Sequence, residues 1–266
     1  MSLVLKKKSV DVCLVGPFIG ELSWEYFRFA PYIIHLIKTN PLNRFIVFTR
    51  PDRFDFYGSY VDIFVPLKIT NDLESKQRGF KLDDFSTESY DALLKTFILK
   101  YKNNYKIVDK IYPDITAFSY KVRWQFPRKR MDYGFQPRKG NYEIIKNFIA
   151  PECVFIDTSI ESHKDIQLEN YSSIITSDFL DNITPFVKNP NISKWGCYIE
   201  AIKNCQFVIG NLSSHISRMA LLLNKPLITI NEKLSNDSIH LINPLETPVI
   251  SCTNIEEGIR IYEDNF

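Results

Sequence analysis

A polar turn between a predicted buried strand and a predicted helix is the first place where residue types suggest chemistry. The strand, residues 206–211 (QFVIGN), ends in a turn with four polar side chains: Asn211, Ser213, Ser214 and His215. Free backbone N–H groups and the positive dipole end of a helix N-terminus bind phosphates well. The turn is therefore a candidate phosphate site. The alternative is that Ser213 only caps the helix and His215 lies on the surface.

A second candidate is the loop GPFIGE, residues 16–21, which follows the first predicted strand, residues 10–15. Gly20 lets the backbone turn tightly or approach a ligand. Glu21 is of a type that can take a proton from an attacking hydroxyl, and Glu25, one helical turn on, would raise the pKa of a nearby carboxyl. The alternative is that these acids simply favour a helix N-terminus.

Basic and aromatic residues alternate in a third segment, residues 119–142, which also holds Arg138. Its candidate ligand contacts are Arg123, Trp124, Arg128, Lys129 and Arg130. Such side chains can contact a phosphate backbone and stack on bases, or they can hold a diphosphate. A solvated loop between two domains is the alternative.

Other classes of site lack their motifs. The histidines outside the turn, His35, His163 and His240, have no carboxylate or cysteine at ligand spacing, so no metal is expected. There is no Asp-x-Asp triplet, no Gly-x-Ser-x-Gly and no phosphate-binding P-loop. No tightly bound cofactor is expected either.

Bulk properties point to a cytoplasmic protein without a membrane span. The five cysteines are scattered and form no pair at metal or redox spacing, which suits reduced thiols in a core. No stretch reaches about 18 apolar residues, the length that a membrane helix needs. The net charge of +2 by itself indicates neither nucleic acid nor an anionic membrane, and it leaves the oligomeric state open.

The first half of the chain alternates predicted strands and helices. Strands are expected at residues 10–15, 44–50 and 61–67. A helix is expected over 21–40 with a kink or break at Pro31, and a Lys-rich helix over 91–109. This order predicts a parallel sheet with crossover connections.

The second half repeats the same logic. Strands are expected at 152–159, 206–211 and 227–232. Helices are expected in part of 168–183, over 193–205 with Ser193 as N-cap, and at the C-terminal end of the chain. The predicted fold class is α/β, with two Rossmann-like halves that face each other across a cleft, residues 1–140 and 141–266.

Two segments resemble the heptosyltransferase-like glycosyltransferases, which have the GT-B type of fold. Residues 193–231 resemble the family's donor-binding helix–strand–loop–helix–strand segment, with matches at Ser214, His215, Ala220, Lys225 and Pro226. Residues 20–33 (GELSWEYFRFAPYI) resemble its N-terminal Gly-Asp loop, with Gly20 and Glu21 in those positions and Pro31 near the family's proline. The acid here is Glu rather than Asp.

The resemblance implies transfer of a sugar from a nucleotide-sugar donor to a hydroxyl, without a metal and with inversion. Residues 1–140 would bind the acceptor and residues 141–266 the donor. Glu21 would be the base, while Gly20, the polar turn and a cation such as Lys225 or Arg128 would contact the donor. The diphosphate would leave from that site.

The acceptor stays open at this level. Compact sugar transferases of viral and phage type look similar, and they suggest a hydroxymethylated base in DNA as the acceptor, with Arg123, Trp124 and residues 128–130 contacting it. A glycan or a protein is the rival acceptor. A non-catalytic nucleotide-binding or DNA-binding accessory protein is the rival class.

Overall fold

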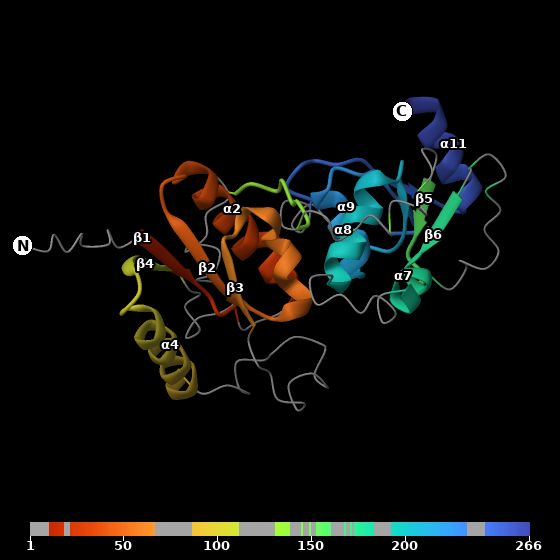
Figure 1. Ribbon diagram of the computed structural model, residues 1–266. Helices are drawn as coiled ribbons and strands as arrows, with labels where there is room; N and C mark the ends of the chain where they lie inside the picture. Colours follow the sequence, from red (N-terminus) through yellow and green to blue (C-terminus); the bar gives the residue numbers. More distant parts are fainter. Residues whose placement is uncertain are drawn as a thin grey trace, which may run out of the picture. The chain divides into compact units, whose positions relative to one another are not determined.

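The computed structural model divides into two compact units (Figure 1). The first comprises Met1–Pro51 and Tyr60–Asp132, and the second comprises Asp52–Ser59 and Tyr133–Phe266. Each unit contains a parallel sheet and helices, so the predicted α/β class with two Rossmann-like halves is confirmed. The residues that the structure describes are 11–18, 22–66, 87–111, 131–138, 145, 149, 153–160, 168, 171, 173–183, 193–232 and 243–266.

The sheet of the first unit has the strand order β3-β2-β1-β4, and each neighbouring pair is parallel. The strands are β1 (Asp11–Val15), β2 (Arg44–Thr49), β3 (Ile63–Pro66) and β4 (Lys106–Ile111). Apolar side chains of the two central strands form the core, and the ring of Phe48 stacks on Phe97 at 3.8 Å between centroids. The three strands expected here are confirmed to within two residues.

The helical segment after β1 is irregular on the N-terminal side of Pro31. It consists of α1 (Leu22–Trp24), a π-helical turn η1 (Glu25–Phe29) and α2 (Ala30–Thr39). The N–H of Ala30 donates to the carbonyl of Glu25, five residues back. A proline in the first turn of α2 has no N–H to offer, so the wider turn precedes it. The predicted break is thus a π-helical turn rather than an end of the helix.

The predicted helix 91–109 is wrong beyond residue 101. Helix α4 (Thr87–Tyr101) ends there, and β4 follows after a short turn. Strand β4 pairs with β1 on one side and carries polar, exposed side chains, including Lys106 and Lys110. Because many of its side chains are charged and exposed, the sequence of this edge strand resembles that of a solvent-exposed helix.

The sheet of the second unit has the order β6-β5-β7-β8-β9, again with parallel pairs throughout. Its strands are β5 (Cys153–Ile156), β6 (Ser173–Thr176), β7 (Val208–Ile209), β8 (Leu227–Ile230) and β9 (Val249–Cys252). Its helices are α7 (Ser177–Ile183), α8 (Lys194–Asn204), α9 (His215–Leu222) and α11 (Ile255–Asn265). The edge strand β6 lies within 168–183, where a helix was expected in part, and within that range the helix α7 begins only at Ser177. The other edge strand, β9, was not predicted.

Two expectations about local packing in this unit are confirmed. Ser193 caps α8, and its Oγ accepts the N–H of Gly196 at 3.0 Å. All five cysteines are buried and unpaired with one another, as small apolar core residues would be.

The segment Asp52–Ser59 lies in the second unit, although the sequence places it between two strands of the first. It carries short 3₁₀ turns, η2 (Pro51–Phe56) and η3 (Gly58–Tyr60). Phe56 packs on Trp195 of α8, with 5.6 Å between ring centroids. Gly58 has a φ of +57°, and a Cβ there would lie 1.6 Å from the carbonyl oxygen of Gln136, so only glycine fits.

Candidate functional site

The carboxyl ends of the strands in the second sheet gather polar side chains from three neighbouring strands. Asp157 follows β5, Asn211 follows β7 by two residues, and Glu232 follows β8 by two residues. Because these strands are parallel and adjacent, their ends meet at one edge of the sheet. Open parallel sheets bind ligands at that edge.

The turn after β7 is organised around the side chain of Asn211. Its Oδ1 accepts the hydroxyl of Ser213 at 2.6 Å and the N–H of Ser214 at 2.8 Å. The hydroxyl of Ser214 in turn accepts the N–H of Ile216 at 3.1 Å and caps α9. The capping residue is therefore Ser214, while the exposed Ser213 bonds within the turn. His215 is the first residue of the helix, as expected.

Two charged side chains hold the main chain of the turn at Leu212. The N–H of Leu212 donates to Oε2 of Glu232 at 2.6 Å. The carbonyl of Leu212 accepts from Nε of Arg218 at 2.6 Å. These contacts place one carboxylate and one guanidinium beside the turn.

A hydroxyl links the turn to the loop after β5. Nδ2 of Asn211 donates to Oγ of Ser159 at 3.0 Å. The N–H of Ser159 donates to Oδ1 of Asp157 at 3.1 Å, which folds the loop into an Asx turn. The polar groups after β5 and β7 thus form one connected surface.

Beneath this surface lies a buried contact between Asp157 and Ser217 of α9. The hydroxyl of Ser217 donates to Oδ2 of Asp157 at 2.9 Å, and both residues are at most 1% exposed. A Cβ on Gly210 would lie 1.9 Å from Oγ of Ser217. Gly210 therefore lets α9 approach the sheet closely enough for this hydrogen bond.

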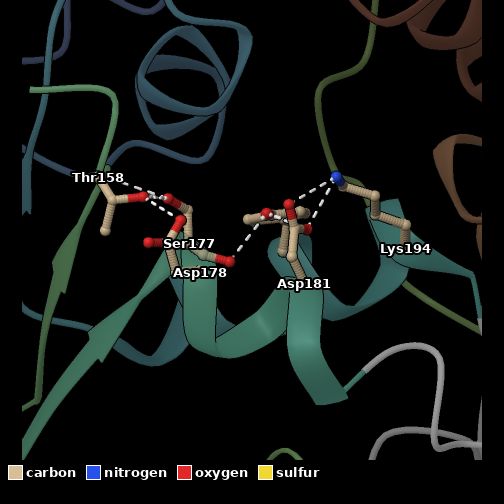
Figure 2. A network of polar contacts seen from close by, with 6 residues as sticks. Thr158, Ser177, Asp178, Asp181 and Lys194 are labelled. Atoms are coloured by element: carbon tan, nitrogen blue, oxygen red, sulfur yellow. Dashed lines mark hydrogen bonds and ion pairs between the residues drawn. The ribbon is translucent and has the colours of Figure 1, made fainter.

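A polar network fixes the next residue of the same loop, Thr158, to α7 (Figure 2). Oγ of Ser177 accepts the N–H of Thr158 at 2.9 Å and lies 2.7 Å from the Thr158 hydroxyl. That hydroxyl also donates to Oδ1 of Asp178. The loop after β5 is thereby held by main-chain and side-chain contacts alike.

The same network continues to α8 through Asp181. This carboxylate accepts from Nζ of Lys194 at 2.8 Å, as Figure 2 shows. It also accepts from the hydroxyl of Tyr198 at 2.6 Å. Burial, together with the hydrogen bond to Asp181, raises the pKa of Tyr198. Tyr198 is therefore a neutral hydrogen-bond donor that ties α7 to α8.

Lys225 lies away from the turn that it was expected to assist. It precedes β8, whereas the turn follows β7, so the two lie at opposite edges of the parallel sheet. Helix α9, with eight residues, spans the about 12 Å between these edges. Nζ of Lys225 donates to the carbonyl of Cys205 at 2.7 Å. Its described contact is thus within the fold, and among the described residues Arg218 is a cation that does contact the turn.

In the first unit, Gly20 and Glu21 lie outside the described residues, and Glu25 is fully buried. Oε1 of Glu25 accepts the hydroxyl of Thr49 at 2.8 Å, at the carboxyl end of β2. A carboxylate with no exposed surface cannot touch a substrate in this arrangement. The hydrogen bond ties the π-helical turn to the end of β2.

The basic and aromatic candidates lie in a part of the chain that the structure does not describe: Arg123, Trp124, Arg128, Lys129 and Arg130. The described end of that segment contains Arg138, whose guanidinium pairs with buried Asp55. The guanidinium of Arg138 thus forms an ion pair within the second unit.

Over the described parts of the chain, no three His, Cys, Asp or Glu side chains come together as a group that could hold a metal ion. The helices in these parts are too short or too polar to cross a bilayer.

Sequence reasoning missed several residues of this edge, although some left a signal. Arg218 lies four residues after Ser214 in the motif SSHISR. Residues with this spacing lie on the same face of a helix, so Arg218 can be expected beside the turn. Glu232 closes the predicted strand 227–232 at its carboxyl end. The contact between Ser159 and Asn211, which are 52 residues apart, left no signal, because only the strand order brings them together.

Comparisons with known proteins bear on the fold. No protein-family model and no curated protein matches the sequence. Among solved structures, the glycosyl transferase family 9 protein from Veillonella parvula matches with a TM-score of 0.50 and 10% identity, over 96% of this chain and 89% of that one. E. coli heptosyltransferase WaaC with ADP matches with a TM-score of 0.46 and 12% identity, over 96% and 100%.

A putative UDP-N-acetylglucosamine 2-epimerase from Listeria monocytogenes also matches, with a TM-score of 0.37 and 10% identity, over 96% of this chain and 87% of that one. At such identities the likeness concerns the fold alone. The expected GT-B type of architecture, with two α/β units on parallel sheets, is confirmed, and the chain has the fold of glycosyl transferase family 9.

Proposed function

We propose that the protein is a glycosyltransferase that moves a sugar from a nucleotide-sugar donor to a hydroxyl acceptor. One observation carries the proposal. At the carboxyl edge of the second sheet, the turn 211–214 leads into α9, with Arg218 and the Ser159 hydroxyl beside it. The fold shared with a glycosyl transferase family 9 protein supports it.

The donor diphosphate would lie against the N-terminal end of α9. The positive end of the helix dipole and the guanidinium of Arg218 both favour negative charge there. Hydroxyls of Ser213 and Ser159, with the ring of His215, supply hydrogen-bond donors of the kind that phosphates and sugars accept. The same groups would stabilise the diphosphate as it leaves.

The transfer itself needs a base and an acceptor. The acceptor hydroxyl oxygen would attack the anomeric carbon, its proton would pass to the carboxylate of Glu21, and the bond from that carbon to the diphosphate oxygen would break. The bonding electrons leave with the diphosphate, and the N-terminal end of α9 and Arg218 would stabilise the resulting charge in place of a metal. A single displacement inverts the configuration. Glu25, fully buried against Thr49, would act only by positioning the segment that carries Glu21.

For the acceptor, we propose a hydroxyl on a biopolymer, with a hydroxymethylated base in DNA as the first candidate and a glycan or protein as the rival. This proposal depends on the basic segment, in particular Arg128, Lys129 and Arg130. Charge reversal at these three positions should abolish DNA binding if DNA is the acceptor. Unchanged DNA affinity would leave the glycan or protein acceptor.

The first test is a thermal-shift screen of the full chain. It uses nucleoside diphosphates and nucleotide sugars, each with magnesium and with EDTA. A ligand that binds the folded state raises the midpoint of unfolding by mass action. A shift with one nucleotide, equal in both buffers, is the expected result. No shift with any member of the panel would overturn the donor assignment and favour a DNA-binding accessory protein.

The second test separates binding from chemistry. Glu21→Gln should bind the donor as the wild type does and lose transfer to any acceptor that the wild type uses. Glu21→Asp should restore part of the turnover. A Glu21→Gln protein with wild-type turnover would reject the base. Donor binding without transfer by the wild-type protein to any acceptor would favour a non-catalytic nucleotide-binding protein.

A further inference from the structure

Oppositely charged side chains hold the main chain of Leu212 on its two sides. Its N–H donates to Glu232 and its carbonyl accepts from Arg218, each at 2.6 Å. Leu212 is 9% exposed, and both of these hydrogen bonds are partly buried. The turn therefore carries a fixed negative charge as well as the fixed positive charge of Arg218.

The backbone at the end of β8 fixes the position of Glu232. Asn231 adopts a left-handed backbone, with φ of 54°, and its N–H donates to the carbonyl of Cys252 at 2.9 Å. The hydroxyl of Thr229 donates to the carbonyl of Glu232 at 3.3 Å. Asparagine tolerates this backbone conformation better than most residues, so the turn directs the following side chain in a defined way.

The Leu212 N–H already binds an anionic group, the carboxylate of Glu232. The N–H lies in the turn to which the proposed function assigns the donor diphosphate. One N–H cannot donate fully to both the carboxylate and a phosphate oxygen. A diphosphate must therefore displace Glu232 or lie beside its charge, and both oppose binding.

We infer that Glu232 is a built-in competitor for the diphosphate and that it speeds departure of the nucleoside diphosphate product. This inference rests on the proposed function. When the product leaves, the carboxylate returns to the Leu212 N–H, so that this partly buried donor keeps an acceptor. Release of product limits turnover in many enzymes, and a residue that weakens product binding raises their rate.

The test compares Glu232→Gln with wild type in the full chain. Glutamine keeps an oxygen that can accept the Leu212 N–H and removes the charge. Calorimetric titration with ADP, UDP, GDP and inorganic pyrophosphate in EDTA measures affinity, and unfolding without ligand checks that the fold is kept. The nucleoside diphosphate that the wild type binds should bind about three- to tenfold more tightly to the variant. Glu256→Gln, which removes an exposed charge from α11, is the matched control and should change nothing.

The outcomes separate the inference from the proposed function. Unchanged or weaker binding to Glu232→Gln, while wild type binds a nucleoside diphosphate, overturns the inference and leaves the proposed function standing. Stronger pyrophosphate binding with weaker nucleoside diphosphate binding also overturns it, since Glu232 would then hold nucleoside hydroxyls. No binding of any probe to either protein overturns both.

Discussion

The guanidinium of Arg138 donates from Nε and Nη2 to the two carboxylate oxygens of Asp55, each at 3.2 Å, across 83 positions of the chain. Asp55 is fully buried, and it also accepts the main-chain N–H of Arg138 and the hydroxyl of Ser193. The segment Asp52–Ser59 is thereby held in the second unit. This basic residue of the segment 119–142 is therefore bound to a buried carboxylate within the second unit.

Replacing Arg138 with methionine should destabilise the second unit strongly. The change removes the bidentate guanidinium partner of the buried Asp55 carboxylate, and breaking a buried ion pair typically costs about 3–5 kcal/mol of unfolding free energy. Urea unfolding followed by tryptophan fluorescence measures it, because Trp195 packs on Phe56 in the same segment. Arg260→Met, on the exposed face of α11, is the control. A loss below about 1 kcal/mol would show that the ion pair adds little.

Gly210 and Ser217 should behave as a coupled pair. Gly210→Ala places a methyl group where Ser217 Oγ lies and breaks the hydrogen bond to buried Asp157, at a cost of about 1–3 kcal/mol. In a Ser217→Ala background the methyl group meets no hydroxyl, so the same change should cost less. The unfolding free energies of the two single variants and the double variant form a double-mutant cycle. Additive costs would contradict the proposed contact.

The N-terminus of α11 should make stability depend on pH. The hydroxyl and N–H of Thr253 both donate to the carboxylate of Glu257, at 2.6 and 2.8 Å, and lower its pKa from the ordinary 4.5. A carboxyl with a lowered folded-state pKa contributes stability that is fully present above pH 4.5 and is lost as the pH falls through the folded-state pKa.

Thermal midpoints of wild type and Glu257→Gln between pH 7 and pH 3 check this prediction. The wild type should be the more stable at neutral pH, and the difference should shrink at the acid end. Glu256→Gln, in the same first turn, removes an exposed carboxylate for comparison. A difference that stays constant over the whole range would refute the role of the ionised side chain.

Arg218 and Lys225 should differ in their effect on nucleotide binding. Arg218→Gln removes a charge beside the turn and should weaken the affinity for a nucleoside diphosphate about ten- to a hundredfold, the value of a hydrogen bond to a charged group. Lys225→Gln removes the same charge from the opposite edge of the sheet, so affinity should be unchanged. Titration calorimetry on both proteins decides, and equal losses would place the ligand elsewhere.

Strongly patterned elements of this protein could be predicted from sequence. Strands β1, β2 and β8 are short apolar runs between turn residues, and Ser193 directly precedes a periodic helix, a pattern that predicts the observed cap. Strand β4 was not found, because an edge strand with charged side chains lacks the apolar pattern of a core strand. The sequence predicts only a break near Pro31, because proline lacks an N–H. It does not show that the helix adjusts through a π-helical turn before the proline.

The candidate site divides in the same way. The turn Asn211–His215 was identified because its residues are contiguous, and local order places them at a strand end before a helix. Lys225 was assigned to that turn on resemblance, and the structure places it a helix length away. Arg218, which contacts the turn through the Leu212 carbonyl, could be expected there from helical spacing.

The sequence by itself determined the two α/β halves, the strand that leads into α9 and the polar turn between them, because these depend on periodicity and on neighbours within a few residues. Only the tertiary structure decided which distant groups meet that turn. Glu232 reaches Leu212 and Ser159 reaches Asn211 through the order of the parallel strands, and elsewhere in the second unit burial brings Arg138 to Asp55. Such contacts join residues 20, 52 and 83 positions apart, and no local preference of the chain encodes them.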